Sequence, residues 1–405
     1  MKSAPHILFL NEFFHPDICA SAVVAADHLP KIATRRPDWN FTILTGNRAW
    51  DDPAKRYPAT DAYYGVNIIR VPRPAVSRKS LLWRGLGFAA FERAALRAAA
   101  RLGRIDLMVG TTAPPQGGRI AAKIAARAKC PYIYKVLDLY PDTAATLGKV
   151  RRGSLIYKRW LAVDTKVMKG AAAAVSISTP ITQRIARTRR IDPALLHTIH
   201  DGYDPARLTL SGPNHFAAEH NPGKAFVVQY AGNMGLSHPF ETILAVARLL
   251  SAEGGIQFQF IGDGPQRAGL RERLPPIARL IDYQPADRLG EVLAAADVCL
   301  ISQHDAMFDQ AMPYKIYAIL AAGKPVFFVG SAHAEIAEWI TQFKIGWIVP
   351  HGRPEQLVEA IRGVMHDSIA RDSMSQAARR LFAERFDSFR AADAWVSLIA
   401  RHITP

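Results

Sequence analysis

The sequence lacks several features that would place it in a specialised class. No apolar run approaches the ~18 residues of a membrane-spanning helix, and the apolar N-terminal segment is short and interrupted by Glu12, unlike a secretory signal. Its three cysteines, Cys19, Cys130 and Cys299, lie far apart without CxxC spacing, and the histidines show no ligand spacing. We therefore expect a reducing cytoplasmic setting, no disulfide framework and no metal site.

Acidic residues are scarce in one half of the chain only. Residues 1–200 contain 32 Lys and Arg against 13 Asp and Glu, a net charge of +19, whereas residues 201–405 contain 19 against 22, a net charge of −3. The overall composition, 49% hydrophobic and 21% charged, is that of a globular protein. The asymmetry predicts two domains with different partners, the first of which meets an anionic surface or ligand.

Short apolar segments alternate with helical segments along both halves. Runs such as "FTILTG", "PYIYKV" and "FVVQYAG" are separated by helical patterns, which indicates parallel sheets with helices on both faces. A Pro- and Gly-rich stretch lies between the halves. The predicted fold class is α/β, with two doubly wound Rossmann-like domains facing across a cleft. We expect domains at 1–204 and 225–385, a linker at 205–224, and a final helix within 386–405.

Glycine-rich loops follow two predicted strands of the second domain. These are "YAGNMG", with Gly232 and Gly235, and "FIGDGP", with Gly262 and Gly264. Ligands of doubly wound sheets bind outside the carboxyl ends of strands, and glycines allow a phosphate to approach the backbone. Either loop alone is explained as well by turn geometry. Their occurrence together with "AMPYKIYAILAAGKPV" in one domain indicates a phosphate-binding site.

These segments, in their order and spacing, resemble a known family. "YAGNMG…HPFETIL", "FIGDGP", "AAADVCLIS" and "PYKIYAILAAGKPV" are similar to bacterial glycosyltransferases of the retaining GT-B family 4, in the colanic-acid and O-antigen branch. Four segments of the first half also resemble this branch: "ILFLNEFFHPDICASAVVAADHL", "TTAPPQGG", "VLDLYPDTAATLG" and "IHDGYDPARL". The final segment "FDSFRAADAWVSLIARHI" resembles the family's last helix, which crosses back onto the first domain.

The resemblance implies three catalytic residues. Lys315 and His238 would stand beside the donor diphosphate, and Asp138 would be the carboxylate nearest the reacting sugar. Each has a simpler interpretation: Lys315 as an exposed lysine at a helix start, His238 as a polar turn residue, and Asp138 as the cap of a turn.

The resemblance also implies binding residues for the donor and for the acceptor. The donor-binding set is Gly232, Asn233, Met234, Gly235, Gly262, Asp263, Gly264, Tyr283, Gln284, Gln310, Pro313, Tyr314 and Tyr317. The acceptor-side loops contribute His15, Pro16, Asp17, Cys19, Thr112 and Pro114.

Several positions depart from the family pattern. Gln310 and Ala318 replace a pair of glutamates, the second of which binds ribose in relatives, and Tyr314 replaces a Ser or Thr. Thr111 or Thr112 stands where relatives place a histidine against the donor sugar. Loss of a carboxylate–ribose contact costs about 1.5–3 kcal/mol of donor affinity. The pattern predicts a transferase whose donor grip is altered, with Tyr317, Gln310 or backbone groups compensating.

The implied activity is metal-independent transfer, with retention, of a hexosyl group from a nucleoside diphosphate sugar, used as co-substrate without a further cofactor. The implied acceptor is a saccharide on a polyprenyl-diphosphate carrier, as in synthesis of a surface exopolysaccharide. Two alternatives share the glycine-rich loops: a non-catalytic sugar-nucleotide binder and a sugar-nucleotide 2-epimerase. A nucleic-acid-binding protein would explain the basic charge, but we find no zinc ligands, RNA-recognition aromatics or recognition helix.

Two basic segments mix aromatic and aliphatic residues with arginines and lysines. Val76–Arg104 includes Trp83, Leu86, Phe88 and Phe91, and Lys149–Trp160 has a similar mixture. Basic amphipathic segments of this kind suit an anionic membrane surface. We therefore expect peripheral attachment to the inner face of the cytoplasmic membrane, with an ordinary helix that has a solvated basic face as the alternative.

Overall fold

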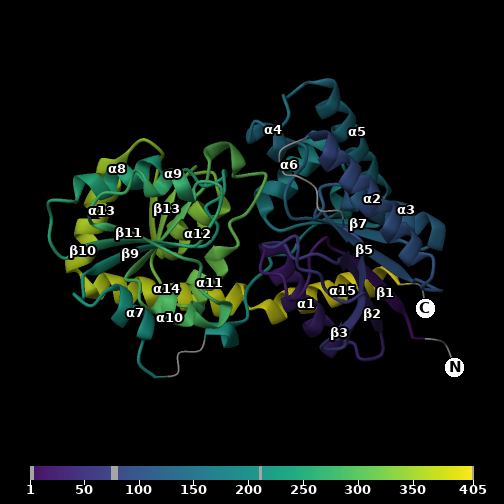
Figure 1. Ribbon diagram of the computed structural model, residues 1–405, viewed down its shortest axis with the longest axis horizontal. Helices are drawn as coiled ribbons and strands as arrows, with labels where there is room; N and C mark the ends of the chain where they lie inside the picture. The colour runs from purple at the N-terminus through teal and green to yellow at the C-terminus, as the bar shows by residue number, and fades with distance from the viewer. Residues whose placement is uncertain (1–3, 74–80, 209–211, 404–405) are drawn as a thin grey trace. The chain divides into compact units, whose positions relative to one another are not determined.

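Continuous apolar strands, buried on both faces, build the two sheets of this protein. A computed structural model describes residues 4–73, 81–208 and 212–403, with residues 81–86 as backbone only. The chain forms two compact units (Figure 1). The first comprises Met1–Asp201, Gln310–Met312 and Ser388–Pro405, and the second comprises Gly202–Asp309 and Pro313–Asp387. Among the described residues, no helix has the length and apolar character that crossing a membrane requires.

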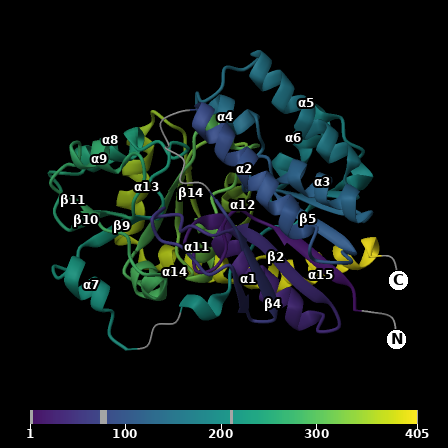
Figure 2. The same ribbon diagram turned by 45° about the vertical axis from the view of Figure 1, so that its right-hand side comes forward.

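The first unit contains an eight-stranded sheet in the order β3-β4-β2-β1-β5-β6-β7-β8, parallel except for β3 against β4. Its strands are β1 (His6–Leu10), β2 (Asn40–Gly46), β3 (Thr60–Tyr63), β4 (Val66–Val71), β5 (Leu107–Thr111), β6 (Tyr132–Val136), β7 (Ala173–Ser176) and β8 (Leu196–Thr198). Its helices are α1 (Ala20–Arg35), α2 (Leu81–Ala99), α3 (Gly117–Ala128), α4 (Asp142–Thr146), α5 (Leu155–Gly170), α6 (Thr179–Arg189) and α15 (Ser388–His402). Helices α1 and α15 pack together on one face of the sheet, and α2, α3 and α5 lie on the other (Figures 1 and 2).

The second unit contains a six-stranded parallel sheet in the order β11-β10-β9-β12-β13-β14. Its strands are β9 (Phe226–Ala231), β10 (Ile256–Ile261), β11 (Ala278–Ile281), β12 (Val298–Ser302), β13 (Val326–Val329) and β14 (Gly346–Val349). Its helices are α7 (His215–His220), α8 (Glu241–Leu249), α9 (Arg267–Arg271), α10 (Leu289–Ala294), α11 (Lys315–Ala321), α12 (Glu335–Phe343), α13 (Pro354–His366) and α14 (Ser368–Arg385). Helices α8 and α13 cover one face, and α14 lies on the other (Figures 1 and 2).

Each sheet has one point at which the strand order reverses. In the first sheet the chain proceeds outward from β1 in one direction and from β5 in the other, and in the second sheet it does so from β9 and β12. The strand ends beside such a reversal are the usual place for a ligand in doubly wound sheets. The glycine loop after β9 and the Thr111–Thr112 end of β5 therefore lie where the fold favours binding.

Two regions differ from the sequence-based expectation. The hairpin of β3 and β4 was not predicted, although its two-residue turn at Tyr64 and Gly65 has positive φ at both positions, as a type I′ turn requires. Segment 205–224 is not a plain linker, because it contains α7. Phe216 in α7 is fully buried with Ile261, Ile281 and Val292 in the second unit. Apolar burial thus draws most of this segment into a domain.

A buried ion pair lies at Asp201, the residue at which the long first segment of the first unit ends. The ammonium of Lys135 on β6 donates to Asp201 at 2.6 Å, and both side chains are less than a tenth exposed. The imidazole of His28 on α1 donates to the carbonyl of Asp201. Trp395 of α15 lies with its ring centre 5.6 Å from the same ammonium. The pair therefore joins the central sheet, α1 and α15 to the point where the chain leaves the unit.

Substitution Asp201→Asn should destabilise the protein by about 3–5 kcal/mol, because it leaves the Lys135 ammonium buried without its counter-ion. The shift in the urea midpoint of unfolding measures this. Asp38→Asn is the matched control: Asp38 pairs with Arg36 at 2.6 Å on the surface, and exposed pairs contribute little. Equal midpoint shifts for the two variants would contradict this account of the buried pair.

Candidate functional site

The two glycine-rich loops of the second unit pack directly against each other. Gly262 has a φ of 129°, and a Cβ there would lie 2.3 Å from the carbonyl oxygen of Gly232. Gly264 has a φ of 147°, and a Cβ there would lie 2.7 Å from the carbonyl oxygen of Met234. Met234 N donates to Asp263 O at 2.7 Å. Glycine at these positions therefore allows the loops after β9 and β10 to form one surface.

The ammonium of Lys315 lies against this surface without a hydrogen-bond acceptor. Lys315 begins α11, and its Nζ would be 3.3 Å from a Cβ placed on Gly232. The Nζ is buried, forms no hydrogen bond or ion pair within the described part of the chain, and lies 3.5 Å from the centre of the Tyr230 ring. Burial holds the pKa of Lys315 well below its ordinary value, opposed by the nearby Cys299 thiol. A buried ammonium without an acceptor is suited to an anionic ligand.

His238 differs from its predicted role as a phosphate neutraliser. Its Nδ1 lies 2.6 Å from Ser302 O, and a carbonyl only accepts, so Nδ1 carries the proton. Burial, together with the charge of Lys315, lowers the pKa of His238 to about 3. The imidazole is therefore neutral, and its Nε2 presents a lone pair. In this form His238 offers a phosphate oxygen an acceptor and no proton, and its place beside the donor diphosphate stays a prediction.

Met234 and Tyr317, which were predicted to bind the donor, have their side chains in the core of the second unit. Met234 is fully buried in the core of the second unit, so only its backbone reaches the loop surface. Tyr317 is 1% exposed, and its ring contacts Tyr314, Trp339 and Phe386. Aromatic packing thus holds the Tyr317 side chain in the core, and its ribose contact stays a prediction.

Gln310 belongs to the first unit. Its carbonyl accepts from Leu139 N at 2.8 Å, and its side-chain oxygen accepts from Thr146 Oγ1 at 3.0 Å. These contacts fix Gln310 to the β6–α4 turn and occupy its side-chain oxygen, and its ribose contact stays a prediction.

The remaining predicted donor residues are distributed around the loops of the second unit. Asn233 and Asp263 are exposed at the loop surface, Tyr283 is 47% exposed after β11, and Gln284 is bonded to Asp282 and Arg288. Pro313 is buried directly before α11, and the Tyr314 ring contacts Tyr203. Helix α8 begins at Glu241, so several residues separate its N-terminus from Gly235.

Asp138 lies at the carboxyl end of β6 and has the properties of a reactive carboxylate. Its backbone N–H donates to Thr112 Oγ1 at 3.2 Å, which also accepts from Leu137 N at 2.9 Å. No hydrogen bond to its carboxylate occurs within the described ranges. Burial raises the pKa of Asp138 to about 6. The Thr112 hydroxyl thus positions the end of the strand. The carboxyl group of Asp138 changes its protonation state near physiological pH.

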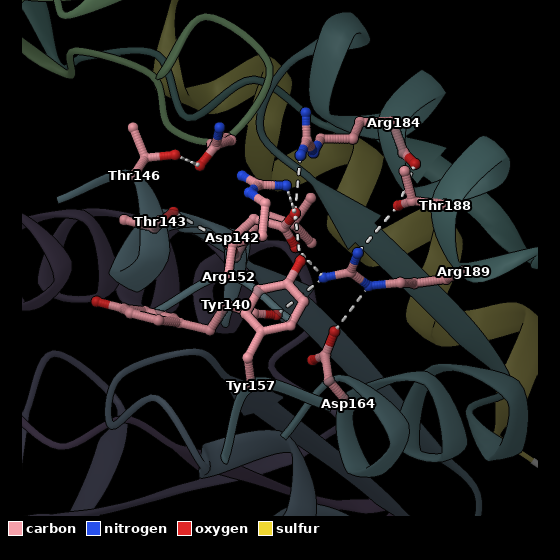
Figure 3. A network of polar contacts seen from close by, with 12 residues as sticks. Tyr140, Asp142, Thr143, Thr146, Arg152, Tyr157, Asp164, Arg184, Thr188 and Arg189 are labelled. Atoms are coloured by element: carbon pink, nitrogen blue, oxygen red, sulfur yellow. Dashed lines mark hydrogen bonds and ion pairs between the residues drawn. The ribbon is translucent and has the colours of Figure 1, made fainter. Parts of the chain in front are cut away.

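Asp142, four residues further along the chain, shows the contrasting structural arrangement (Figure 3). It accepts from Arg184 at 2.7 Å, Arg189 at 2.5 Å and Tyr157 at 3.2 Å. Burial acts to raise the pKa of Asp142, but Arg189 and Arg184 outweigh it and hold the pKa below its ordinary value. Asp142 is therefore a fully satisfied ion-pair partner, whereas Asp138 is not.

The acceptor-side residues around α1 are mainly structural. Asp17 is buried and accepts from Trp50 N at 2.9 Å and Tyr57 Oη at 3.1 Å, which holds the loop before β3. His15 stacks on Tyr63 with ring centres 4.2 Å apart. Burial raises the pKa of Cys19 to about 11, so its thiol is unreactive. Pro16 and Pro114 follow cis peptide bonds in the two loops.

The sequence reasoning missed two residues that shape the phosphate surface. Tyr230 at the end of β9 lies beneath Lys315, and its hydroxyl donates to Asn233 O at 2.7 Å. Gln266 donates to the carbonyls of Gly235 and His238. The signal for Gln266 was its place directly after "GDGP"; Tyr230 gives no signal in the sequence beyond its place in a strand. No metal-binding group of three or more His, Cys, Asp or Glu occurs among the described residues.

Comparisons with known proteins identify both halves. Residues 23–202 match the glycosyl transferase 4-like domain, and residues 213–381 match the glycosyl transferases group 1 model. The chain is 24% identical over 277 residues to the probable glycosyltransferase WbjE of Pseudomonas aeruginosa, covering 66% of this chain and 68% of that protein. It is 25% identical over 219 residues to WcaI of Escherichia coli (strain K12), named for colanic acid biosynthesis, covering 52% of this chain and half of that protein.

Solved structures show the fold. Sucrose-phosphate synthase from Thermosynechococcus elongatus superposes with a TM-score of 0.76 at 14% identity, covering 98% of each chain. HepE of Anabaena, in complex with UDP-glucose, superposes with a TM-score of 0.71 at 13% identity, covering 98% of this chain and 99% of that one. The predicted GT-B fold is thereby confirmed.

Substitution Lys315→Met should leave the stability of the ligand-free protein unchanged or raise it by about 1–2 kcal/mol, because it replaces a buried ammonium without an acceptor by an apolar side chain. The matched control is Lys324→Met. The Lys324 ammonium donates to Ala294 O at 3.1 Å and Ala296 O at 2.6 Å, so its loss should cost about 1–3 kcal/mol. Urea unfolding at neutral pH measures both, and an equal loss of stability would contradict the description of Lys315.

Proposed function

The chain belongs to the group 1 glycosyltransferases, and from this we propose that it transfers a hexosyl group from a nucleoside diphosphate sugar to a saccharide on a polyprenyl-diphosphate carrier. The transfer would proceed with retention and without a metal, at the inner face of the cytoplasmic membrane, during synthesis of a surface polysaccharide. Two family models in sequence, one for each half of the chain, support this activity.

The observation that carries the proposal is the buried ammonium of Lys315. It has no acceptor in the described structure, and it lies at the glycine loops beside the strand-order reversal of the second sheet. A donor diphosphate would supply the missing acceptor oxygens and would favour the charged form of Lys315. As the nucleotide departs, negative charge grows on the diphosphate, and Lys315 would stabilise it where water is excluded.

Asp138 supplies the second proposed role, on the first unit. In a retaining transfer its carboxylate would stabilise the positive charge that develops on the sugar, and in an inverting transfer it would accept the proton of the acceptor hydroxyl. Both roles require the ionised form. A pKa of about 6 leaves Asp138 mostly ionised at neutral pH while keeping it basic enough to act.

The relatives support the proposed donor class and the link to polysaccharide synthesis. HepE was solved with UDP-glucose, a nucleoside diphosphate sugar, and WcaI is named for colanic acid biosynthesis. Since the chain aligns with half of WcaI only, the acceptor rests on our interpretation of the basic first half.

A thermal-shift screen against UDP, GDP, dTDP, ADP and CMP, each with representative sugars, tests the donor site. A nucleotide at about 100 times its Kd should add about 2.7 kcal/mol of stability. Lys315→Met should lose the shift and Lys324→Met should keep it. A screen without any shift, or a shift that Lys315→Met retains in full, would refute the site. Release of nucleotide only when acceptor is present separates a transferase from a 2-epimerase.

Substitution Asp138→Asn should lower turnover at least about 100-fold while nucleotide binding and stability are retained. The pH dependence of wild-type turnover should show an acid limb near 6, because protonation abolishes the active form as pH falls. Asp142→Asn is the contrasting control: it should destabilise the protein, since Arg184 and Arg189 lose their counter-ion. Wild-type turnover that stays constant from neutral pH to well below 6 would exclude an ionised Asp138 from the mechanism.

A further inference from the structure

Helix α5 presents apolar side chains to solvent along its outer face. Leu155 is 66% exposed, Ile156 is 64% exposed and Val163 is 41% exposed. These three lie within nine residues of one helix, whereas the other exposed large apolar residues of the described chain are scattered over loops and distant helices. Apolar side chains grouped on one surface mark a place where a protein contacts another phase or molecule.

The same face carries a strong positive charge. Residues 149–170 contain seven Lys and Arg and a single acidic residue, Asp164. Lys158, Arg159 and Lys166 are exposed beside the apolar residues. Asp164 is buried and bonded to Arg189 at 3.3 Å, so it does not offset the charge of the outer face. We call Leu155, Ile156, Arg159, Val163 and Lys166 the α5 face.

The inner side of α5 is fixed by the polar network of Figure 3. Asp164 and Tyr157, both on α5, bond to Arg189 and Asp142 respectively. Arg189 of α6 joins these two carboxylates, and it also donates to Tyr140 O at 3.1 Å. The helix starts at the Ser154 cap, whose side chain accepts from Tyr157 N. The α5 face is thus held outward by a rigid support, and rearrangement to bury it would break these buried ion pairs.

The other basic segment fits this role less well. In Val76–Arg104, Phe91 is 2% exposed and belongs to the core of the first unit, and Phe88 is half-buried. Val76–Ser80 and the side chains of Trp83 and Leu86 lie outside the described residues. The expectation of a membrane-facing helix therefore fails for Phe91, and among the residues whose side chains the structure describes, apolar exposure and positive charge coincide on α5.

We propose that the α5 face docks the protein on an anionic phospholipid surface. The arginines and lysines would contact lipid phosphates while Leu155, Ile156 and Val163 enter the interface between headgroups and acyl chains. The charge selects an anionic partner, and the aliphatic side chains favour a membrane over a nucleic acid, whose surface offers phosphates and no apolar layer.

Docking by the α5 face would also bring Asp138, at the end of β6, towards the acceptor. The network that supports α5 includes Tyr140 and Asp142, which follow Asp138 within four residues. A carrier lipid presents its saccharide at the membrane surface, so α5 would bring the end of β6 to the acceptor. This consequence rests on the proposed transferase function, whereas membrane docking itself does not.

Flotation with phosphatidylcholine vesicles, with and without phosphatidylglycerol, tests the docking. Wild-type protein should bind the anionic vesicles, and binding should weaken with salt without disappearing. The double substitution Leu155→Asn and Ile156→Asn should lower the partition coefficient at least about tenfold. Arg159→Glu should abolish the preference for anionic vesicles. Thermal unfolding checks that these surface variants remain folded.

The matched control is the double substitution Leu249→Asn and Ile369→Asn. It removes two equally apolar and exposed residues, 52% and 81% accessible, from other helices, and it should leave vesicle binding unchanged. Wild-type protein that ignores anionic vesicles, or equal binding by both double variants, would overturn the inference. Binding of a DNA oligonucleotide through the α5 face, without vesicle binding, would overturn it as well.

The nucleotide thermal shift separates this inference from the proposed function. An α5 variant that loses vesicles but keeps the nucleotide shift supports docking by α5. A protein with a nucleotide shift that does not bind vesicles refutes α5 docking and the proposed membrane location, and it leaves the proposed donor binding and sugar transfer in place. Vesicle binding without any nucleotide shift refutes the donor site alone.

Discussion

The buried pair of Lys135 and Asp201 is the constraint on which the first unit depends. It joins β6 in the middle of the sheet to the residue at which the chain leaves, and His28 and Trp395 bring α1 and α15 to the same point. The strand that carries Lys135 ends just before Asp138. Because a buried ion pair tolerates little displacement without a large loss of energy, it fixes the position of the strand end that we assign to chemistry.

Buried side chains of the same type have different roles in this protein because their hydrogen-bond and ion-pair partners differ. Lys135 and Lys324 are buried with acceptors, whereas the ammonium of Lys315 is buried without one in the described structure. Asp142 has two arginines, and Asp138 has no described donor to its carboxylate. The satisfied groups hold the fold together. The unsatisfied ones are held at an energetic cost that a ligand or a reaction can relieve.

Sequence pattern predicted the elements whose signal is local. Continuous apolar strands, the glycine loops and the final helix are all recognisable along the chain. The hairpin of β3 and β4 was missed because its edge strand is short and polar, and α7 was missed because it is short and has a single buried residue, Phe216. At the candidate site, Lys315 was found from its motif, but Tyr230 beneath it was not, because that contact joins residues 85 positions apart.

Local sequence patterns are sufficient to predict the two-domain α/β class, the order of the loops and the basic character of the first half, since each depends on residues close together in the chain. Which side chains remain available depends on how distant segments pack. Tertiary structure placed Tyr317 in an aromatic core, engaged Gln310 at the β6–α4 turn and made His238 neutral through burial and its bond to Ser302. Burial and partnership arise only when distant segments pack, so no local pattern encodes them.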